Sequence, residues 1–300
     1  VNAILHQSIS LSSDISEQDP KGSIPTWLEQ ALPTPSKELY EVWLQPPTQV
    51  GVRINTLIQD QDAYIKALAD QHITIYQHIG ASFMVDKSAI HKLPGLKEHK
   101  VYIQDLNQQA VTSLLPTLPA GAHVLDACAA PGGKAGALIN QQPQIKLHVI
   151  DKNPEKIPRT KSNLEGLSAN ITVACEDATV THKQRSYQAI LVDAPCSATG
   201  TLQQNPEIRL LHDEETIHSL TQEQLKLLHS LWTKLTPEGY LLYSTCSILP
   251  KENHETIQRF IQTIEAQENK EKALIIREIK NNPQHNIQGN YACLLQKRTA

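Results

Sequence analysis

The chain has 300 residues, of which 40% are hydrophobic and 19% charged, a composition typical of a globular protein rather than a disordered or fibrous one. At this length it can bury the core of one large domain and a smaller one. Its 27 basic and 31 acidic residues leave a net charge of −4, so any nucleic-acid partner would have to be bound by a local basic patch.

The first 23 residues are polar, and the stretch SLSSDISEQDPKGS within them is typical of a linker. The opening VNAILHQSIS has no basic segment followed by a long apolar one, so no signal peptide is predicted. No apolar run approaches the roughly 20 residues that span a bilayer. We therefore expect a cytoplasmic protein that makes no membrane contact.

Residues 24–104 combine helix-like and strand-like segments. The helix-like segments are PTWLEQALPTPSKELYEVWLQ and DQDAYIKALADQ, and the strand-like runs are VGVRIN, ITIYQ and SFMVD. This pattern predicts a small α+β module. Two basic clusters could contact phosphate, although clusters of this size are more often solvated surface: Lys92, Lys97 and Lys100 here, and Lys152, Lys156, Arg159 and Lys161 further on.

Residues 105–300 alternate short apolar runs with helix-like segments. The runs are AHVLDAC (122–128), KLHVID (146–151), ITVACED (171–177), YQAILVDA (187–194), GYLLYSTC (239–246), ALIIREI (273–279) and YACLLQK (291–297). This alternation predicts an α/β, Rossmann-like domain with a mostly parallel seven-stranded sheet and helices on both faces. Such a sheet binds its ligand beyond the carboxyl ends of the strands.

Acidic residues close several of these runs: Asp126, Asp151, Asp177 and Asp193. A single strand-end Asp is as often a helix cap as a ligand contact, but four along one edge favour a ligand site. The loop CAAPGGKAG lets a ligand approach backbone N–H groups, yet it matches neither the P-loop nor the GxGxxG pattern. Asp151 is placed to accept both hydroxyls of a ribose. An adenosine without phosphate fits best, which points to S-adenosylmethionine as cofactor.

The five cysteines are an odd number without CxxC spacing, so they predict neither a disulfide framework nor a metal site. Three lie in or beside apolar strands, where a free thiol packs as a small hydrophobe: Cys128, Cys175 and Cys293. Cys196 and Cys246 instead follow strands predicted to be neighbours. Two thiols in one cleft suit methylation of pyrimidine carbon 5, which requires a thiolate to add at carbon 6 and leave again.

The motifs DACAAPGGK, VDAPCSATGT and YSTCSILPKEN resemble the cofactor loop and the two cysteine motifs of the RNA 5-methylcytosine methyltransferase family. The resemblance extends through PTWLEQAL, VRIN, VYIQDLNQQA and YACLLQK, and so covers nearly the whole chain. It implies ribosomal RNA processing: methyl transfer from S-adenosylmethionine to a cytosine of small-subunit (16S) ribosomal RNA. It also implies that the small module at residues 24–104 helps to bind the RNA, and we expect the protein to be monomeric. In bacterial members a domain similar to the antitermination factor NusB lies upstream, and VNAILHQ resembles its last helix, so we expect most of that domain to be missing here.

The resemblance also implies the roles of individual residues. Cys246 is the implied nucleophile, and Cys196 assists product release as a general base, for which a polar site could lower the pKa of its thiol. Lys134 and Asp193 are implied to hold the cytosine edge. The implied cofactor site consists of Cys128, Ala129, Ala130, Pro131, Gly132, Gly133, Lys134, Asp151, Asp177 and Asp193.

The chain departs from the family pattern at residues 203–205, where basic residues are usual, and at Asn290 and Tyr291, where two aromatic residues are usual. These departures concern RNA contacts rather than the chemistry. Two alternatives stay open. In a DNA cytosine methyltransferase Cys196 would attack instead, which STCS with its downstream PKEN argues against. A non-catalytic RNA-binding or ribosome-assembly protein would have no need of the complete set of acids and thiols.

Overall fold

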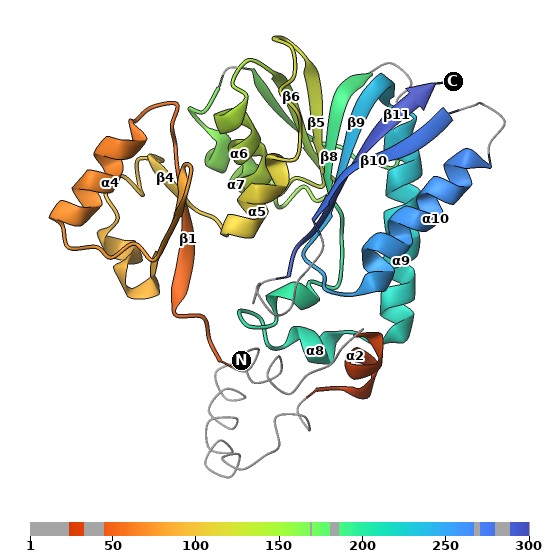
Figure 1. The fold of residues 1–300 in the computed structure, drawn as a ribbon, viewed down its shortest axis with the longest axis horizontal. Helices are drawn as coiled ribbons and strands as arrows, with labels where there is room; N and C mark the ends of the chain where they lie inside the picture. Colours follow the sequence, from red (N-terminus) through yellow and green to blue (C-terminus); the bar gives the residue numbers. More distant parts are fainter. Residues whose placement is uncertain are drawn as a thin grey trace.

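The computed structural model describes residues 24–32, 45–168, 170–180, 186–266, 271–279 and 289–299. These residues form two sheets, a four-stranded sheet in the order β2-β3-β1-β4 and a seven-stranded sheet in the order β10-β11-β9-β8-β5-β6-β7 (Figure 1). The predicted linker over residues 1–23 lies outside the described residues.

The small sheet is antiparallel throughout. Its strands are β1 (Gln49–Ile54), β2 (Gln77–Ile79), β3 (Ser82–Asp86) and β4 (Val101–Ile103), and it carries the helices α4 (Gln61–Asp70) and η3 (Lys87–Lys92). Helix α4 begins at Asp60, whose Oδ1 accepts a hydrogen bond from the Ala63 N–H at 2.8 Å. Tyr64 and Leu68 on its buried face pack with Phe83 in the module core.

The runs VGVRIN and SFMVD form strands as predicted, but ITIYQ does not. Its strand begins only at Gln77, where pairing with β3 begins opposite Met84; the last two residues of β3, Val85 and Asp86, pair only with β1. Strand β4, which is three residues long, is too short to show a periodic pattern in the sequence.

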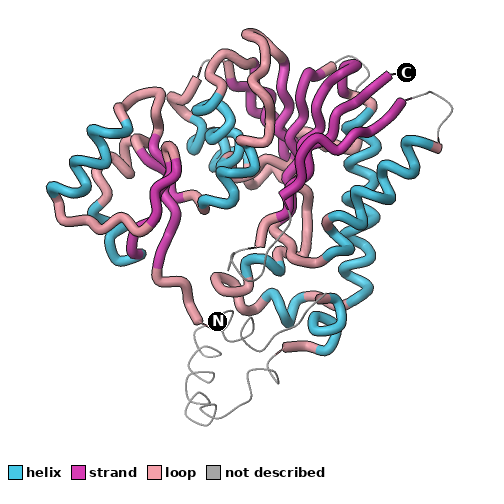
Figure 2. Tube along the Cα trace, viewed as in Figure 1, coloured by secondary structure: helices cyan, strands magenta, loops and turns pink. Residues whose placement is uncertain are grey.

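The large sheet confirms the predicted α/β architecture. Its strands are β5 (His123–Ala127), β6 (Lys146–Asp151), β7 (Ile171–Cys175), β8 (Tyr187–Asp193), β9 (Leu235–Thr245), β10 (Glu271–Ile279) and β11 (Tyr291–Thr299). The first five are parallel, whereas β11 runs antiparallel to both β9 and β10. Figure 2 shows the strands in magenta and the helices in cyan. No helix separates β7 from β8 within the described residues 176–180 and 186.

Helices cover both faces of this sheet (Figure 1). They are α5 (Leu106–Thr112), α6 (Gly133–Gln141) and α7 (Ile157–Leu164) on one face, and α9 (Glu214–Trp232) and α10 (His254–Glu265) on the other. Successive side chains of a strand point to opposite faces. In β8, Ile190 and Val192 therefore pack with α9 and α10, while Leu191 packs in the core under α6.

Helix α2 (Thr26–Ala31) lies beside the large domain, although its sequence precedes the small sheet (Figure 1). Its fully buried Leu28 packs with Leu249 and with Ile208 of the short helix α8 (Ile208–Leu211). The remainder of that predicted helical segment, residues 33–44, lies outside the described residues. The predicted domain boundaries after residues 23 and 104 stay predictions.

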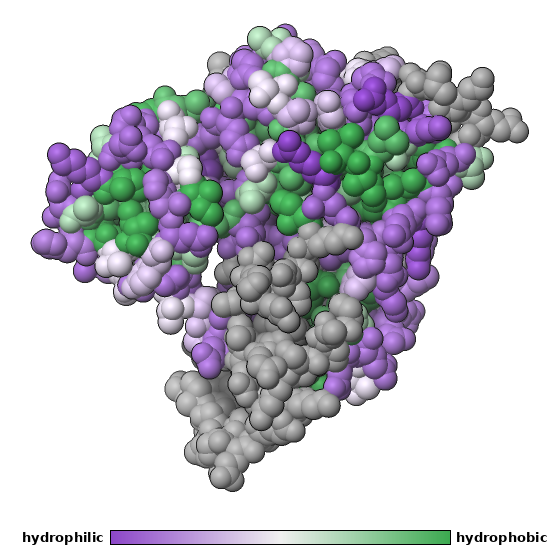
Figure 3. Space-filling model, in the orientation of Figure 1, coloured by the Kyte–Doolittle hydropathy of each residue, from purple (hydrophilic) through white to green (hydrophobic). Residues whose placement is uncertain are grey.

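Apolar side chains are exposed at the β10 end of the large sheet (Figure 3). Leu274, Ile275 and Ile276 on this edge strand are between 42% and 48% exposed.

Candidate active site

The five parallel strands end at one edge of the large sheet, in the spatial order β9, β8, β5, β6, β7. The predicted site residues follow in the same order. Cys246 comes directly after β9. Asp193 is the last residue of β8, and Cys196 follows it. The CAAPGGK loop follows β5, Asp151 is the last residue of β6, and Asp177 follows β7. The edge therefore has a cysteine end and an acidic end, which meet at the loop.

The structure brings Cys196 and Cys246 together, with their Sγ atoms 3.4 Å apart and both side chains half-buried. The contact follows from the register of β8 and β9, in which Asp193 pairs with Ser244 shortly before the two cysteines. The expectation that a polar site lowers the pKa of Cys196 is wrong. The hydrogen bond with Cys246 raises this pKa well above its usual value, and burial and the charges of Cys246 and Glu252 raise it further.

A second pair of groups lies at this end of the edge. Lys134 Nζ is 2.6 Å from Asp193 Oδ2, and the lysine side chain is only 8% exposed. Lys134 Nζ also donates to Gln108 Oε1, and Ser244 Oγ donates to Asp193 Oδ1 at 2.9 Å. Lysine and carboxylate are thus held in one orientation from α5, α6, β8 and β9.

The loop before α6 depends on glycine at position 132. Gly132 has a φ of 95°, a conformation that side chains rarely adopt, and a Cβ there would lie 3.3 Å from Leu164 Cγ. Asp151 anchors the other side of the loop, because its Oδ2 accepts from the Ala130 N–H at 3.1 Å. Its Oδ1 accepts from the Asn153 N–H at 2.9 Å. The acid is therefore fixed directly beside the glycine-rich loop.

Next to this loop, at the acidic end, is a cavity of about 350 Å³ lined by Cys128, Lys152, Asp177 and Glu223, among others. Asp177 Oδ1 accepts hydrogen bonds from both the N–H and the Oγ1 of Thr179, each at 2.7 Å, and these bonds lower the pKa of Asp177. One oxygen of this carboxylate thus caps a turn. Burial raises the pKa of the Cys128 thiol to about 12, so this cysteine is neutral at physiological pH.

Asp126 differs from the other acids of the edge. It is fully buried, and neither carboxylate oxygen has a hydrogen-bond partner among the described residues. Burial, followed by the charge of Asp193, raises the pKa of Asp126 well above its usual value. Asp126 does not line the cavity at the acidic end, but the charged groups that act on it are those of the site, Asp193, Lys134 and Asp151.

Sequence reasoning did not identify three polar residues at this edge as part of the site: Gln108, Ser244 and Glu252. Gln108 contacts Lys134, and its side-chain amide lies 3.0 Å from that of Asn290, one of the positions that depart from the family pattern. Tyr291, the other, is buried, and its hydroxyl donates to Glu278 at 2.6 Å. The signals were present in the sequence, since DLNQQA, YSTC and PKEN all belong to the stretches that resemble the family.

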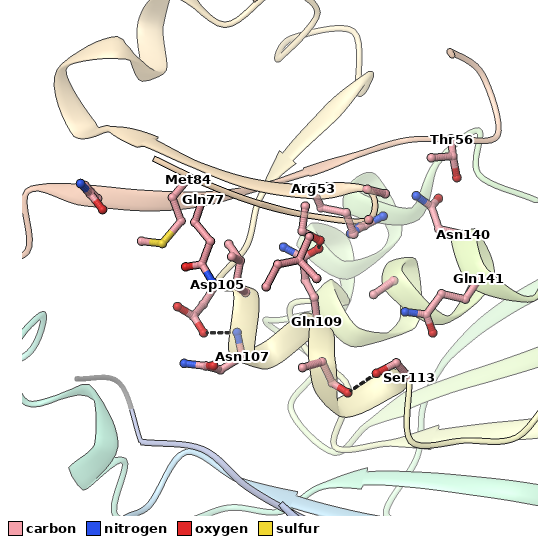
Figure 4. A pocket seen from close by; sticks show the side chains of 18 residues that line it. Arg53, Thr56, Gln77, Met84, Asp105, Asn107, Gln109, Ser113, Asn140 and Gln141 are labelled. Carbon is pink, nitrogen blue, oxygen red and sulfur yellow. Dashed lines mark hydrogen bonds between the residues drawn. The ribbon is translucent and has the colours of Figure 1, made fainter. Parts of the chain in front are cut away.

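A larger cavity, of about 670 Å³, lies between the small sheet and the helices α5 and α6 (Figure 4). Neutral polar side chains line much of it, with Gln77 on the module side and Asn107, Gln109, Asn140 and Gln141 on the helices. Helix α5 separates it from the cysteines, since Gln108 faces Lys134 while Gln109 faces this cavity.

The basic clusters singled out in the sequence are exposed on the surface, and Lys152 pairs with Glu223 at 2.5 Å. Within the described ranges, no three His, Cys, Asp or Glu side chains are grouped as metal ligands. No helix in that part of the chain is long and apolar enough to cross a bilayer.

The chain is similar to known proteins in sequence and in fold. Residues 113–294 match the family model described as 16S rRNA methyltransferase RsmB/F. Over 276 residues, 87% of this chain, the sequence is 31% identical to ribosomal RNA small subunit methyltransferase B of Salmonella newport (strain SL254). The chain spans 64% of the length of that curated relative.

Two solved structures from Pyrococcus horikoshii share the fold. NSun6, crystallised with SFG, superposes with a TM-score of 0.76 at 16% identity, covering 93% of this chain and 99% of its own. A methyltransferase homolog protein superposes with a TM-score of 0.72 at 22% identity, covering 87% of this chain and 90% of its own. At these identities the likeness concerns the fold alone.

Proposed function

Since the chain belongs to the 16S rRNA methyltransferase RsmB/F family, we propose that it methylates carbon 5 of a cytosine in small-subunit ribosomal RNA, through a covalent adduct of Cys246. The observation that carries this proposal is the contact of two thiols, 3.4 Å apart, at one sheet edge with the Lys134–Asp193 pair. Methylation of an exocyclic amine would require no cysteine at all.

The residues at the acidic end suit S-adenosylmethionine. Backbone N–H groups of the loop, the fixed carboxylate of Asp151 and the cavity beside Asp177 offer acceptors for ribose hydroxyls and an adenine amine, and no phosphate-binding pattern is present in the loop. When bound, this cofactor supplies an electrophilic methyl group. Asp151 would hold the ribose and Asp177 the adenine amino group, while residues 128–134 would line the methionine part.

Carbon 5 of cytosine is too weak a nucleophile to take a methyl group unaided. When Cys246 Sγ forms a bond to carbon 6, the electron pair of the 5,6 double bond moves toward carbon 5, which can then attack the methyl group. Lys134 and Asp193, held in one orientation, would donate to and accept from the cytosine edge and so polarise the ring toward attack.

Product release requires a base to take the carbon 5 proton, so that the 5,6 double bond re-forms and the Cys246 sulfur–carbon bond breaks. We assign this step to Cys196, directly or through water. The largest cause of its raised pKa is the hydrogen bond with Cys246. Once Cys246 is bonded to carbon it can no longer carry a negative charge beside Cys196. That cause of the raised pKa is then removed, and a larger fraction of Cys196 is the thiolate, the form that can accept the carbon 5 proton.

The target cytosine must be unstacked to expose carbon 6, so single-stranded or loop RNA is the proposed substrate. The 670 Å³ cavity beside α5 offers amide donors and acceptors to a neighbouring nucleotide, and the small module supplies one wall. We propose that the protein acts as a monomer in the cytoplasm, on RNA and without a metal.

The test is a denaturing gel of protein incubated with S-adenosylmethionine and substrate RNA. Cys196→Ala should accumulate a denaturation-resistant protein–RNA adduct, because the bond to Cys246 forms but is not released. Cys246→Ala and the double variant should form no adduct. The control, Cys175→Ala, changes an exposed thiol away from the pair and should give the same amount of adduct as the parent. An adduct that survives in Cys246→Ala and disappears in Cys196→Ala would contradict the proposal and favour the DNA-enzyme type of chemistry.

A further inference from the structure

Glu252 is a completely buried carboxylate next to the two cysteine loops. It lies at the end of η5 (Pro250–Glu252). Its Oε1 accepts from the Ser197 N–H at 2.8 Å and from Gln224 Nε2 at 3.1 Å. Its Oε2 is 2.5 Å from the hydroxyls of both Ser197 and Ser247. No basic side chain pairs with it in the described part of the chain, so hydrogen-bond donors alone compensate its charge.

The hydroxyl groups around Glu252 can all donate toward its carboxylate, which then acts only as an acceptor. Ser247 Oγ accepts from the Leu249 N–H at 3.0 Å, and its nearest acceptor for its single hydroxyl proton is Glu252 Oε2. Thr199 Oγ1 accepts from the Ile248 N–H at 3.2 Å and lies 3.1 Å from Ser197 Oγ, which in turn donates to Glu252. The donors of both loops thus converge on one anion.

The serines that Glu252 binds are the residues directly after the two thiols, Ser197 after Cys196 and Ser247 after Cys246. Gln224, on α9, donates to Glu252 and also to the Pro195 carbonyl at 2.9 Å, which fixes the residue before Cys196. The neighbouring Asn253 fixes the Cys246 loop in the same way. Its Oδ1 accepts from Thr245 Oγ1 at 2.6 Å, and its Nδ2 donates to the Ser247 carbonyl at 2.9 Å.

We infer that Glu252 is a positioning residue: its buried carboxylate holds the loops of Cys196 and Cys246 at the spacing that sequential attack and release require. The consequence of this inference for catalysis rests on the proposed function. The hydrogen bonds of Glu252 to the two loops do not depend on it. A carboxylate suits this position better than an amide. At the Oε1 position, the NH₂ group of glutamine would face two donors, Ser197 N–H and Gln224 Nε2; at the Oε2 position, both serine hydroxyls would have to accept instead of donate. The charge would also be lost from beside Cys196.

The geometric test uses dibromobimane, which bridges two adjacent thiols, and mass spectrometry of the Cys196 and Cys246 peptides. The ratio of bridged to singly modified peptide reports spacing once it is corrected for the reactivity of each thiol, measured in parallel with monobromobimane. We expect the parent and Glu265→Gln, a control at an exposed glutamate of α10, to give the same ratio. Glu252→Gln should lower the ratio about tenfold, since small misplacements of reacting groups have large effects.

The functional readout separates positioning from general stability. With Glu252→Gln, kcat for methyl transfer should fall about tenfold or more while KM and calorimetric affinity for S-adenosylmethionine stay unchanged. An unchanged bridging ratio would overturn the inference, as would a loss of cofactor affinity that parallels the loss of bridging.

A second variant decides the question if Glu252→Gln does not fold. Ser247→Ala removes a single donor of the carboxylate in the Cys246 loop, and we expect it to lower the bridging ratio while cofactor affinity is retained. A bridging ratio equal to that of the parent in a folded Ser247→Ala would overturn the inference. Because bridging requires neither RNA nor cofactor, failure of the parent to make 5-methylcytosine would reject the proposed function and leave this result standing.

Discussion

The cysteine end and the acidic end of the sheet edge differ in how completely their polar groups are bonded to one another. Around Cys196 and Cys246, fully buried serine, threonine and glutamate side chains form a continuous hydrogen-bonded network. At the acidic end, Asp177 and Glu223 border an open cavity of about 350 Å³. A fully bonded network fixes atoms that must react, whereas an open cavity lets a ligand enter and leave.

The two ends meet at Lys134, which follows the cofactor loop but pairs with Asp193 at the cysteine end. Substitutions at each end should therefore have different signatures. At the cysteine end they should affect the rate of methyl transfer, and at the acidic end they should affect cofactor affinity.

The largest effect is expected for Lys134→Met, which keeps the length of the side chain but removes its charge. Asp193 and Gln108 then lose the donor that orients them, and the cytosine edge is no longer polarised. We expect the single-turnover rate of methyl transfer at saturating cofactor to fall roughly 10²-fold, as when one preorganised donor is removed from an active site. Lys146→Met is the control, because this exposed lysine lies at the start of β6, at the opposite end of the strand from the site. A rate within twofold of that of the parent would remove Lys134 from the proposed chemistry.

Asp151→Ala should have the next largest effect, on cofactor binding. It removes both the acceptor for the ribose and the anchor of the Ala130 N–H, and charged hydrogen bonds of this kind contribute about 1.5 to 3 kcal/mol. Calorimetry should show an affinity for S-adenosylmethionine at least tenfold weaker. Asp177→Ala should weaken binding less, because Asp177 already bonds to Thr179 and is largely exposed to solvent. Equal affinities of parent and Asp151→Ala in a folded protein would disprove the assignment.

The sequence predicts most of the edge because the relevant signals are local. Alternating apolar residues mark the strands of the large sheet, and each predicted site residue follows one of them within a few positions. The closeness of Cys196 and Cys246 follows from the prediction that β8 and β9 are neighbours, which the register of Asp193 with Ser244 confirms.

What the sequence could not predict depends on contacts between distant segments. Glu252 is 55 positions from Ser197, and only the folded chain shows that its carboxylate accepts from both cysteine loops. Asp126 looks like the other strand-end acids, yet it precedes the strand end by one residue and is buried in the core. The composition of ITIYQ favours a strand, yet only its last residue, Gln77, pairs with β3.

The smallest predicted effect concerns the cavity between the small sheet and α5, which lies outside both ends of the edge. Gln77 and Gln141 face it from opposite walls and carry no charge (Figure 4). If a nucleotide next to the target cytosine binds there, Gln77→Ala and Gln141→Ala should each weaken RNA binding about two- to tenfold, the loss of one hydrogen bond of about 0.5 to 1.5 kcal/mol. Fluorescence anisotropy over a range of salt concentrations would measure this change.

The salt dependence gives this last prediction a sharper form. A lysine that contacts phosphate contributes to the slope of log affinity against log salt, whereas a neutral amide does not. The glutamine variants should therefore shift the whole line and leave its slope unchanged, with cofactor affinity and the thiol bridging ratio equal to those of the parent. Gln71→Ala, at an exposed glutamine beyond the end of α4 and outside the cavity lining, is the matched control. If Gln71→Ala weakens RNA binding as much as Gln77→Ala does, the cavity has no specific part in RNA binding. RNA would then have to reach Cys246 along another surface.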